Sequence, residues 1–112
     1  MFSVIYITAG NMEEARKIGR TLVDEHLCAC ANIFPITSIY RWKGKIEEGS
    51  EFGIFIKTTN SNIKNIEKMV KQLHSYETPC VISLNIDEGS EDYLKWIEGS
   101  VHSEPFPIRK DD

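Results

Sequence analysis

Two long runs of β-forming residues, separated by only two turn residues, occupy the middle of the chain. Residues 30–42 are rich in β-branched and aromatic side chains, and residues 45–58 follow directly after Lys43-Gly44. Because glycine readily adopts the backbone angles of a tight turn, this pattern predicts a β-hairpin that reverses at Gly44. The strand pattern is interrupted a second time at residues 48–50, which is compatible with a bulge or with an alternative turn.

The length of this predicted hairpin constrains the assembly. Strands average about 5–6 residues, and each arm here is about twice that length. At ~3.3 Å per residue, one arm would span roughly 40 Å, which is longer than a compact domain of 112 residues. The hairpin should therefore extend past its own core, and its free edges would favour aggregation unless another chain pairs with them. We expect oligomerisation through the hairpin.

The remaining segments alternate between strand and helix patterns. In chain order they predict a strand at residues 2–8, a helix starting at Asn11, the hairpin, a helix capped by Ser61, a strand at residues 81–86 and a short helix starting at Ser90. Asn11 and Glu14 have the spacing of a capping box. The order β-α-β-β-α-β plus a C-terminal helix predicts an α+β, ferredoxin-like fold. The chain length suits one domain at residues 1–112, with a frayed tail at residues 109–112.

Both faces of the strands expected at the sheet centre are largely apolar. Val4 and Tyr6 alternate with Ile5 and Ile7, and the region around Ile54 shows a similar pattern. Helices cover one face of such a sheet, so the opposite face should be polar if it met water. A partner subunit is the simplest cover for a second apolar face.

The charge balance argues against a nucleic-acid partner. Thirteen Lys and Arg residues stand against seventeen Asp and Glu residues, which gives a formal charge of −4 and no basic patch. An RNA-recognition module has the same element order, but it needs a stacking aromatic residue where this chain has Ile54. Glu51 also stands where that module carries a basic residue.

The cysteines and the N-terminal residues favour a location in the cytoplasm. Three cysteines are an odd number without the pattern of a disulfide framework, which favours a reducing environment. The first residues lack the positive region of a signal peptide. No apolar run approaches the ~20 residues of a membrane helix. We expect a cytoplasmic protein without a membrane partner.

Four segments carry a family resemblance: Ala29-Cys30-Ala31-Asn32-Ile33, Ser38-Ile39-Tyr40-Arg41-Trp42-Lys43-Gly44-Lys45-Ile46-Glu47, Lys57-Thr58 and His74-Ser75-Tyr76-Glu77-Thr78-Pro79. Together they resemble the CutA family of divalent-cation tolerance proteins, and the run from Tyr40 to Glu47 is the most specific of them. The resemblance implies a homotrimer similar to PII-type signalling proteins, in which long hairpins wrap around neighbouring subunits. It also implies a link to tolerance of copper and other divalent metals.

Two positions depart from the family pattern. The end of the second helix in the family usually has the sequence His-Pro-Tyr-Glu-x-Pro-Glu, whereas this chain has Ser75 in place of the first proline and Cys80 in place of the last glutamate. Losing that carboxylate weakens a hard, oxygen-rich cation site. A thiol at position 80 favours a soft metal such as Cu(I).

Cys30 matches the family's recurrent cysteine in the second strand and is the first candidate metal ligand. We expect His74 and Cys80 to contribute to the same copper site, because thiolate and imidazole suit Cu and Zn. The alternative for Cys30 is a small core residue, since free cysteine is often buried. Cys28 would face the same side as Cys30 if the strand extends that far, and its role stays open.

Polar residues cluster where the second helix gives way to the last strand. His74, Tyr76 and Glu77 could line a cleft that binds a metal or an anionic metabolite. The alternative is an ordinary helix exit that ends at Pro79. Lys57 either reaches the same cleft or extends along the surface at a strand end.

Tyr40 and Trp42 lie on the hairpin, where large aromatic residues with a polar tip usually anchor an interface and less often stack on a ligand. No nucleophile and base pair, phosphate loop or dinucleotide motif is present, so we expect no enzyme. One alternative is a PII-like sensor of a small molecule, although the Lys43-Gly44 turn is short for its ligand loop. Another is a scaffold that binds proteins in the cleft between subunits.

Overall fold

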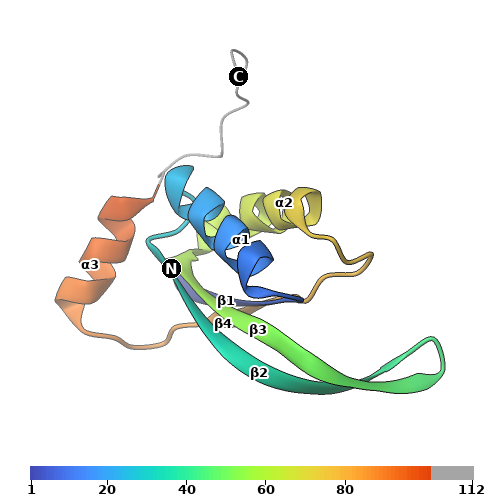
Figure 1. Cartoon of the computed structure of the whole chain (residues 1–112). Helices are drawn as coiled ribbons and strands as arrows, with labels where there is room; N and C mark the ends of the chain where they lie inside the picture. The colour runs from blue at the N-terminus through green and yellow to red at the C-terminus, as the bar shows by residue number, and fades with distance from the viewer. Residues whose placement is uncertain (102–112) are drawn as a thin grey trace, which may run out of the picture.

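The computed structural model describes residues 1–101 as a four-stranded antiparallel sheet covered on one face by helices (Figure 1). Its elements are β1 (Phe2–Ala9), α1 (Met12–Asp24), β2 (Cys30–Trp42), β3 (Lys45–Thr59), a 3₁₀ turn (Asn60–Asn62), α2 (Ile63–Leu73), β4 (Val81–Asn85) and α3 (Glu91–Ser100). The strand order is β2-β3-β1-β4. This confirms the predicted α+β order. The tail predicted at residues 109–112 lies outside the described residues.

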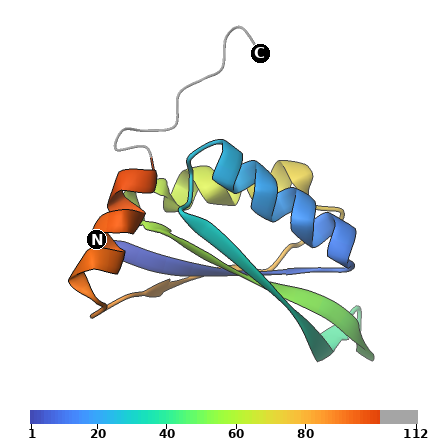
Figure 2. The same ribbon diagram turned by 60° about the vertical axis from the view of Figure 1, so that its left-hand side comes forward.

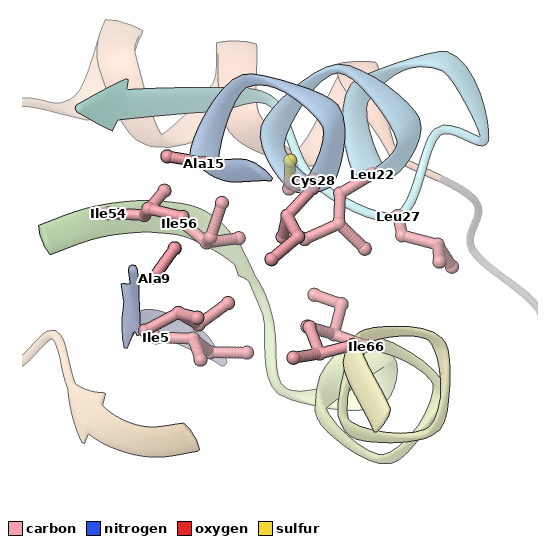
Figure 3. Packing of buried hydrophobic residues seen from close by; sticks show 12 residues of the cluster. Ile5, Ala9, Ala15, Leu22, Leu27, Cys28, Ile54, Ile56 and Ile66 are labelled. Atoms are coloured by element: carbon pink, nitrogen blue, oxygen red, sulfur yellow. The ribbon is translucent and has the colours of Figure 1, made fainter. Parts of the chain in front are cut away.

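The core lies between the sheet and the two long helices. Figure 2 shows α1 and α2 on the same side of the sheet, with α3 at the end near the N-terminus. Ile5 and Ile7 face this side from β1, and they pair directly with Ile56 and Ile54 of β3. All four isoleucines are fully buried and pack against the apolar stripes of α1 and α2 (Figure 3). Alternation along the strands and helical spacing along the helices thus meet in one cluster.

Two of the three predicted helix caps are correct. Asn11 Oδ1 accepts a hydrogen bond from the Glu14 amide at 2.8 Å, and Ser90 Oγ accepts one from the Tyr93 amide at 3.2 Å. The Ser61 cap is wrong, because Ser61 lies inside the 3₁₀ turn that precedes α2. Its hydroxyl is hydrogen-bonded to Thr59 Oγ1 at 3.1 Å and does not cap α2.

The hairpin is continuous from base to tip. β2 and β3 pair without interruption from Cys30↔Lys57 to Trp42↔Lys45. Lys43 and Gly44 both have positive φ, 51° and 80°, as a two-residue hairpin turn of type I′ requires. Residues 48–50 lie inside the regular ladder, so the alternative turn and the bulge considered there are absent. The far half of the hairpin projects beyond the helices, as its length predicts (Figure 1).

The face of the sheet opposite the long helices is apolar, as predicted. Tyr6, Phe34 and Phe55 form an aromatic cluster on it, with ring centroids 5.0 to 6.4 Å apart. Phe55 remains partly exposed, and Ile82 and Leu84 of β4 are each half exposed. Residues 1–101 therefore cover this aromatic face only in part.

Gly53 allows the aromatic cluster to pack against the backbone of β3, and this can be tested by adding one methyl group. A Cβ at Gly53 would lie 2.8 Å from two ring atoms of Phe34 and 3.1 Å from Tyr6. We expect Gly53→Ala to lower the free energy of unfolding by about 1–3 kcal/mol, because overpacking displaces the rings. Urea unfolding measures the loss.

Gly49→Ala is the matched control for this substitution. Gly49 lies in the same strand, and no atom lies within 4 Å of its added Cβ. Equal stability of the two variants would contradict the close packing at Gly53.

Candidate functional site

A cavity of about 650 Å³ lies between β1, the hairpin and the segment that follows α2. This volume falls within the range of about 300–1,000 Å³ that is typical of small-molecule sites. Several residues predicted from the sequence line it: Tyr40, Trp42, Tyr76, Glu77 and Cys80. The long hairpin and the exit of the second helix, which are separate in sequence, therefore form one site.

A tyrosine and a glutamate form the central polar contact of this cavity. The Tyr76 hydroxyl donates a hydrogen bond to Glu51 Oε2 at 2.5 Å. Glu51 is only 8% exposed although it lies in the long strand β3. Burial, and then the adjacent Glu51 carboxylate, raise the pKa of Tyr76 above its usual range, so the phenol remains a donor at neutral pH.

His74 supports the cavity wall through both of its ring nitrogens. Its side chain is buried, and Nε2 donates to the Thr8 carbonyl oxygen at 2.6 Å. Nδ1 accepts a hydrogen bond from the Tyr76 amide at 3.0 Å. These two bonds fix the tautomer that carries its proton on Nε2. His74 could bind a metal only by exchanging one of them, so its role as a ligand stays a prediction.

Glu14 ties the start of α1 to the exit of α2. Its Oε2 accepts a hydrogen bond from the Ser75 amide at 2.7 Å, and its Oε1 lies 3.4 Å from the donating Gly10 amide. A proline at position 75 would have no amide hydrogen for this bond. Burial is the largest single influence and acts to raise the pKa of Glu14, but the hydrogen bonds from Ser75, the nearby His74 and the Gly10 amide together lower that pKa.

Cys80 lies beside β1, next to His74. Its thiol points to the Tyr6 carbonyl oxygen at 3.9 Å, while His74 binds the carbonyl of Thr8. Residues two apart on a strand are separated by about 6.6 Å, so the two side chains occupy neighbouring positions on this strand edge. Burial raises the pKa of the Cys80 thiol. A metal that binds there must displace a proton.

Cys30 and Lys57 lie in a different place, on the aromatic face near α3. Lys57 Nζ donates to the Tyr93 hydroxyl at 3.2 Å and lies 5.3 Å from the centre of its ring. This hydrogen bond raises the pKa of Lys57. Cys30 Sγ lies 3.7 Å from the same hydroxyl oxygen. Lys57 therefore does not line the cavity in the single chain.

The two neighbouring cysteines also differ in burial. Cys30 is partly exposed, so the alternative that it is a core residue is wrong. Cys28 is the core cysteine, and burial raises its pKa to about 12. β2 begins at Cys30, so the strand that would have placed both thiols on one side does not extend to Cys28.

Within one chain, Cys30 lies apart from the other two predicted metal ligands, His74 and Cys80. In the sheet, Cys30 pairs with Lys57, which aligns with Val4 of β1, whereas Cys80 directly precedes Val81, the partner of Ile7. Three strand spacings of ~4.8 Å and about four residues of ~3.3 Å separate the two cysteines by roughly 20 Å. Within residues 1–101, no group of three or more His, Cys, Asp or Glu side chains is placed to hold a metal ion.

The family profile described as "CutA1 divalent ion tolerance protein" matches residues 3–100. The chain belongs to the CutA1 family. It is 43% identical to the divalent-cation tolerance protein CutA of Archaeoglobus fulgidus, over 90% of this chain and 99% of that protein. It is also 43% identical to the human protein CutA, over 85% of this chain and 54% of the human protein.

Solved CutA structures confirm the ferredoxin-like fold of this CutA1 chain. The Archaeoglobus fulgidus structure, described as a periplasmic divalent cation tolerance protein, superposes with a TM-score of 0.89 at 42% identity and covers 91% of this chain and all of its own. The CutA1 structure from Oryza sativa also gives a TM-score of 0.89, at 36% identity, over 92% of this chain and 95% of that one. Among residues 1–101, no helix has the length and apolarity to cross a membrane.

Sequence reasoning missed three residues that shape this CutA1 cavity and its surroundings. In the sequence, Glu51 indicates only a mismatch to an RNA-binding motif, and Glu14 indicates only a helix cap. Tyr93 lies within the short last helix and has no sequence-predicted role, yet its hydroxyl joins Lys57 and Cys30. The available indication was the position of Glu51, directly before the apolar part of β3 that begins at Phe52.

The lowered pKa of Glu14 predicts a pH-dependent contribution to stability. We expect Glu14→Gln to reduce the free energy of unfolding by about 1–2 kcal/mol at pH 7, because hydrogen bonds to a charged acceptor are the stronger ones. A carboxyl pKa lowered on folding stabilises above the unfolded value of about 4.3, and this contribution disappears as the pH falls through the folded value. The difference should therefore shrink as the pH falls below about 4.3 and vanish only below the lower pKa of the folded state.

Denaturant unfolding between pH 3 and pH 7 measures this difference. Glu13→Gln is the matched control, since Glu13 is exposed in the same first turn of α1. A loss for Glu14→Gln that is the same at every pH would contradict the assignment.

Proposed function

We propose that this CutA1 protein confers tolerance to divalent cations by binding copper as a homotrimer in the cytoplasm, without enzymatic activity. One observation carries the proposal, namely the chemistry of the cavity lining. Glu51 and Glu77 contribute carboxylates and Cys80 contributes a thiol, whereas no lysine, arginine or histidine is among those of residues 1–101 that line the cavity. Such a lining attracts cations and disfavours the nucleotides or carboxylate metabolites of a PII-like sensor.

The donor set suits a soft cation, but it is incomplete in one chain. Thiolates favour Cu(I), while carboxylates alone favour harder ions. Cys80 lies in the cavity and Cys30 lies roughly 20 Å away by strand spacing, so both can bind one ion only if they come from different subunits. In this proposal His74 joins the site by releasing one of its two hydrogen bonds.

The exposed surface of the hairpin supports the trimer. Ile39 and Ile46 are each 67% exposed, and Tyr40 and Trp42 are also exposed hydrophobic residues of the same hairpin. Ile39 and Ile46 lie on one face of the hairpin, and Tyr40 and Trp42 lie on the other, because side chains alternate along a strand. Exposed apolar residues on both faces of a long hairpin are typical of an interaction surface. We assign Tyr40 and Trp42 as interface anchors at the edge of the cavity.

Charge placed on the hairpin tests this assembly. We expect the wild-type protein to elute at three chain masses, and Ile46→Glu to shift it to smaller species, because a buried unpaired charge strongly destabilises an interface. Size-exclusion chromatography with light scattering measures the mass. Lys64→Glu, at an exposed position of α2, should leave the trimer intact. A monomeric wild-type protein would contradict the proposal.

Substitution of the thiols tests the copper site. We expect Cys30→Ser and Cys80→Ser each to lower the affinity for Cu(I) at least tenfold with the trimer intact, as measured by competition with a chromogenic chelator. The affinity of the wild type should rise between pH 6 and pH 8, because binding displaces the proton of a thiol whose pKa burial raises. Cys28→Ala, which removes a thiol outside the proposed site, is the control variant. Unchanged copper stoichiometry and affinity in both serine variants would refute the site.

A further inference from the structure

The ring of His74 lies between a carbonyl oxygen on one side and a carboxylate on the other. Its Nε2 donates to the Thr8 carbonyl oxygen at 2.6 Å, and its Nδ1 lies 3.7 Å from Glu14 Oε2. The His74 side chain is fully buried, and the Glu14 side chain is only 12% exposed. A carboxylate behind a histidine ring is the arrangement that orients histidine ligands in metal sites. The position of Glu14 therefore bears on how His74 can act as a ligand.

The Nε2 side of the ring faces the candidate thiol. Nε2 contacts the carbonyl of Thr8, and the Cys80 thiol points to the Tyr6 carbonyl two residues earlier on β1. The Cys80 thiol also interacts with the side chain of Thr8. An imidazole nitrogen and a thiol at neighbouring positions are donors that suit copper. Nε2 is therefore the nitrogen that His74 can offer to an ion held by Cys80.

The hydrogen bonds of the single chain place a proton on this nitrogen. A neutral imidazole has one N–H group and one lone pair, so a lone pair on Nε2 requires the proton to lie on Nδ1. In the structure Nδ1 accepts a hydrogen bond from the Tyr76 amide at 3.0 Å. A protonated Nδ1 would meet that amide as a second donor. The exchange of tautomer therefore needs a new acceptor beside Nδ1, because a buried donor left without one is costly.

Glu14 is placed to be this acceptor. A movement of about 1 Å would bring its Oε2 within hydrogen-bond distance of Nδ1. A carboxylate offers about four acceptor positions, and within residues 1–101 only the amides of Ser75 and Gly10 are hydrogen-bonded to Glu14. No lysine or arginine in this part of the chain forms an ion pair with it. Its remaining positions can accept the Nδ1–H group of His74 and the displaced amide of Tyr76.

We propose that Glu14 is a positioning residue of the copper site, which holds His74 in the tautomer with its proton on Nδ1 and so presents Nε2 as a ligand. This inference rests on the proposed copper function and deepens it, since it assigns the ligating nitrogen and the residue that supports it. In the copper-free chain the proton stays on Nε2, where the Thr8 carbonyl accepts it. The segment after α2 thus has two hydrogen-bond arrangements, one for each state.

Long-range ¹H–¹⁵N NMR spectra test the tautomer directly, because they distinguish a protonated ring nitrogen from one with a lone pair. We expect His74 to carry its proton on Nε2 in the chelator-treated, full-length protein. After titration with Cu(I), which is diamagnetic, we expect the proton on Nδ1. His26, which is exposed beyond the end of α1, is the internal control and should keep its spectrum.

Substitution of Glu14 tests its contribution to affinity. We expect Glu14→Gln, which leaves only a neutral acceptor, to lower the affinity for Cu(I) at least tenfold, because loss of a carboxylate behind a histidine ligand usually costs about 10–100-fold. Glu14→Asp, which retains the charge, should recover part of that loss. Glu13→Gln, in the same turn of α1, is the matched control and should bind as the wild type does. Thermal unfolding and light scattering establish that each variant is folded and assembled.

Three results would overturn the proposal: a His74 proton that stays on Nε2 in the copper-loaded protein, an unchanged Cu(I) affinity of folded Glu14→Gln, or an equal loss in Glu13→Gln. In each case, Cu(I) binding that still depends on Cys30 and Cys80 would leave the proposed copper function in place. A wild-type protein that does not bind Cu(I) would overturn both.

Discussion

The uninterrupted pairing of β2 with β3 is the constraint on which the other features depend, because this ladder sets which side chains share a face and which lie far apart. Cys30 faces Lys57 at one end of the hairpin, and Trp42 faces Lys45 at the other. A shift by one residue would move the side chains of a strand to the opposite face. The register therefore fixes the core, the aromatic face and the position of Glu51 at once.

Side-chain hydrogen bonds then connect this hairpin to the rest of the chain. Tyr76 binds Glu51 of β3, His74 binds the Thr8 carbonyl of β1, and Glu14 of α1 binds the Ser75 amide. Three elements thus hold the short segment after α2 in place. Because these bonds occupy both nitrogens of His74, the same network that forms the cavity also restricts which groups are free to bind a ligand.

The elements were predictable from sequence because their causes are local. Alternating apolar residues, a Lys43-Gly44 turn and an Asn11 cap act over a few positions, and the structure contains all of them. The site was less predictable, because its contacts join residues distant in sequence. No local pattern indicates that Glu51 meets Tyr76 or that Cys30 and Cys80 lie at opposite ends of the sheet. The prediction that Ser61 caps α2 was wrong because the Ser61 hydroxyl is hydrogen-bonded to Thr59 instead. The capping pattern, which starts at Ser61, does not include Thr59.

The central place of β1 in the sheet also has a consequence for the order of folding. β1 is synthesised first, yet its two neighbours are β3 and β4, and the latter is formed by Val81–Asn85 near the end of the chain. Hairpins close in about 1–10 μs, whereas translation adds about 5–20 residues per second. The hairpin can therefore form on the ribosome well before β4 exists. Until then the edge of β1 that later pairs with β4 has unpaired backbone N–H and C=O groups. A nascent chain therefore exposes an edge that another strand could pair with while the α2 region is being synthesised.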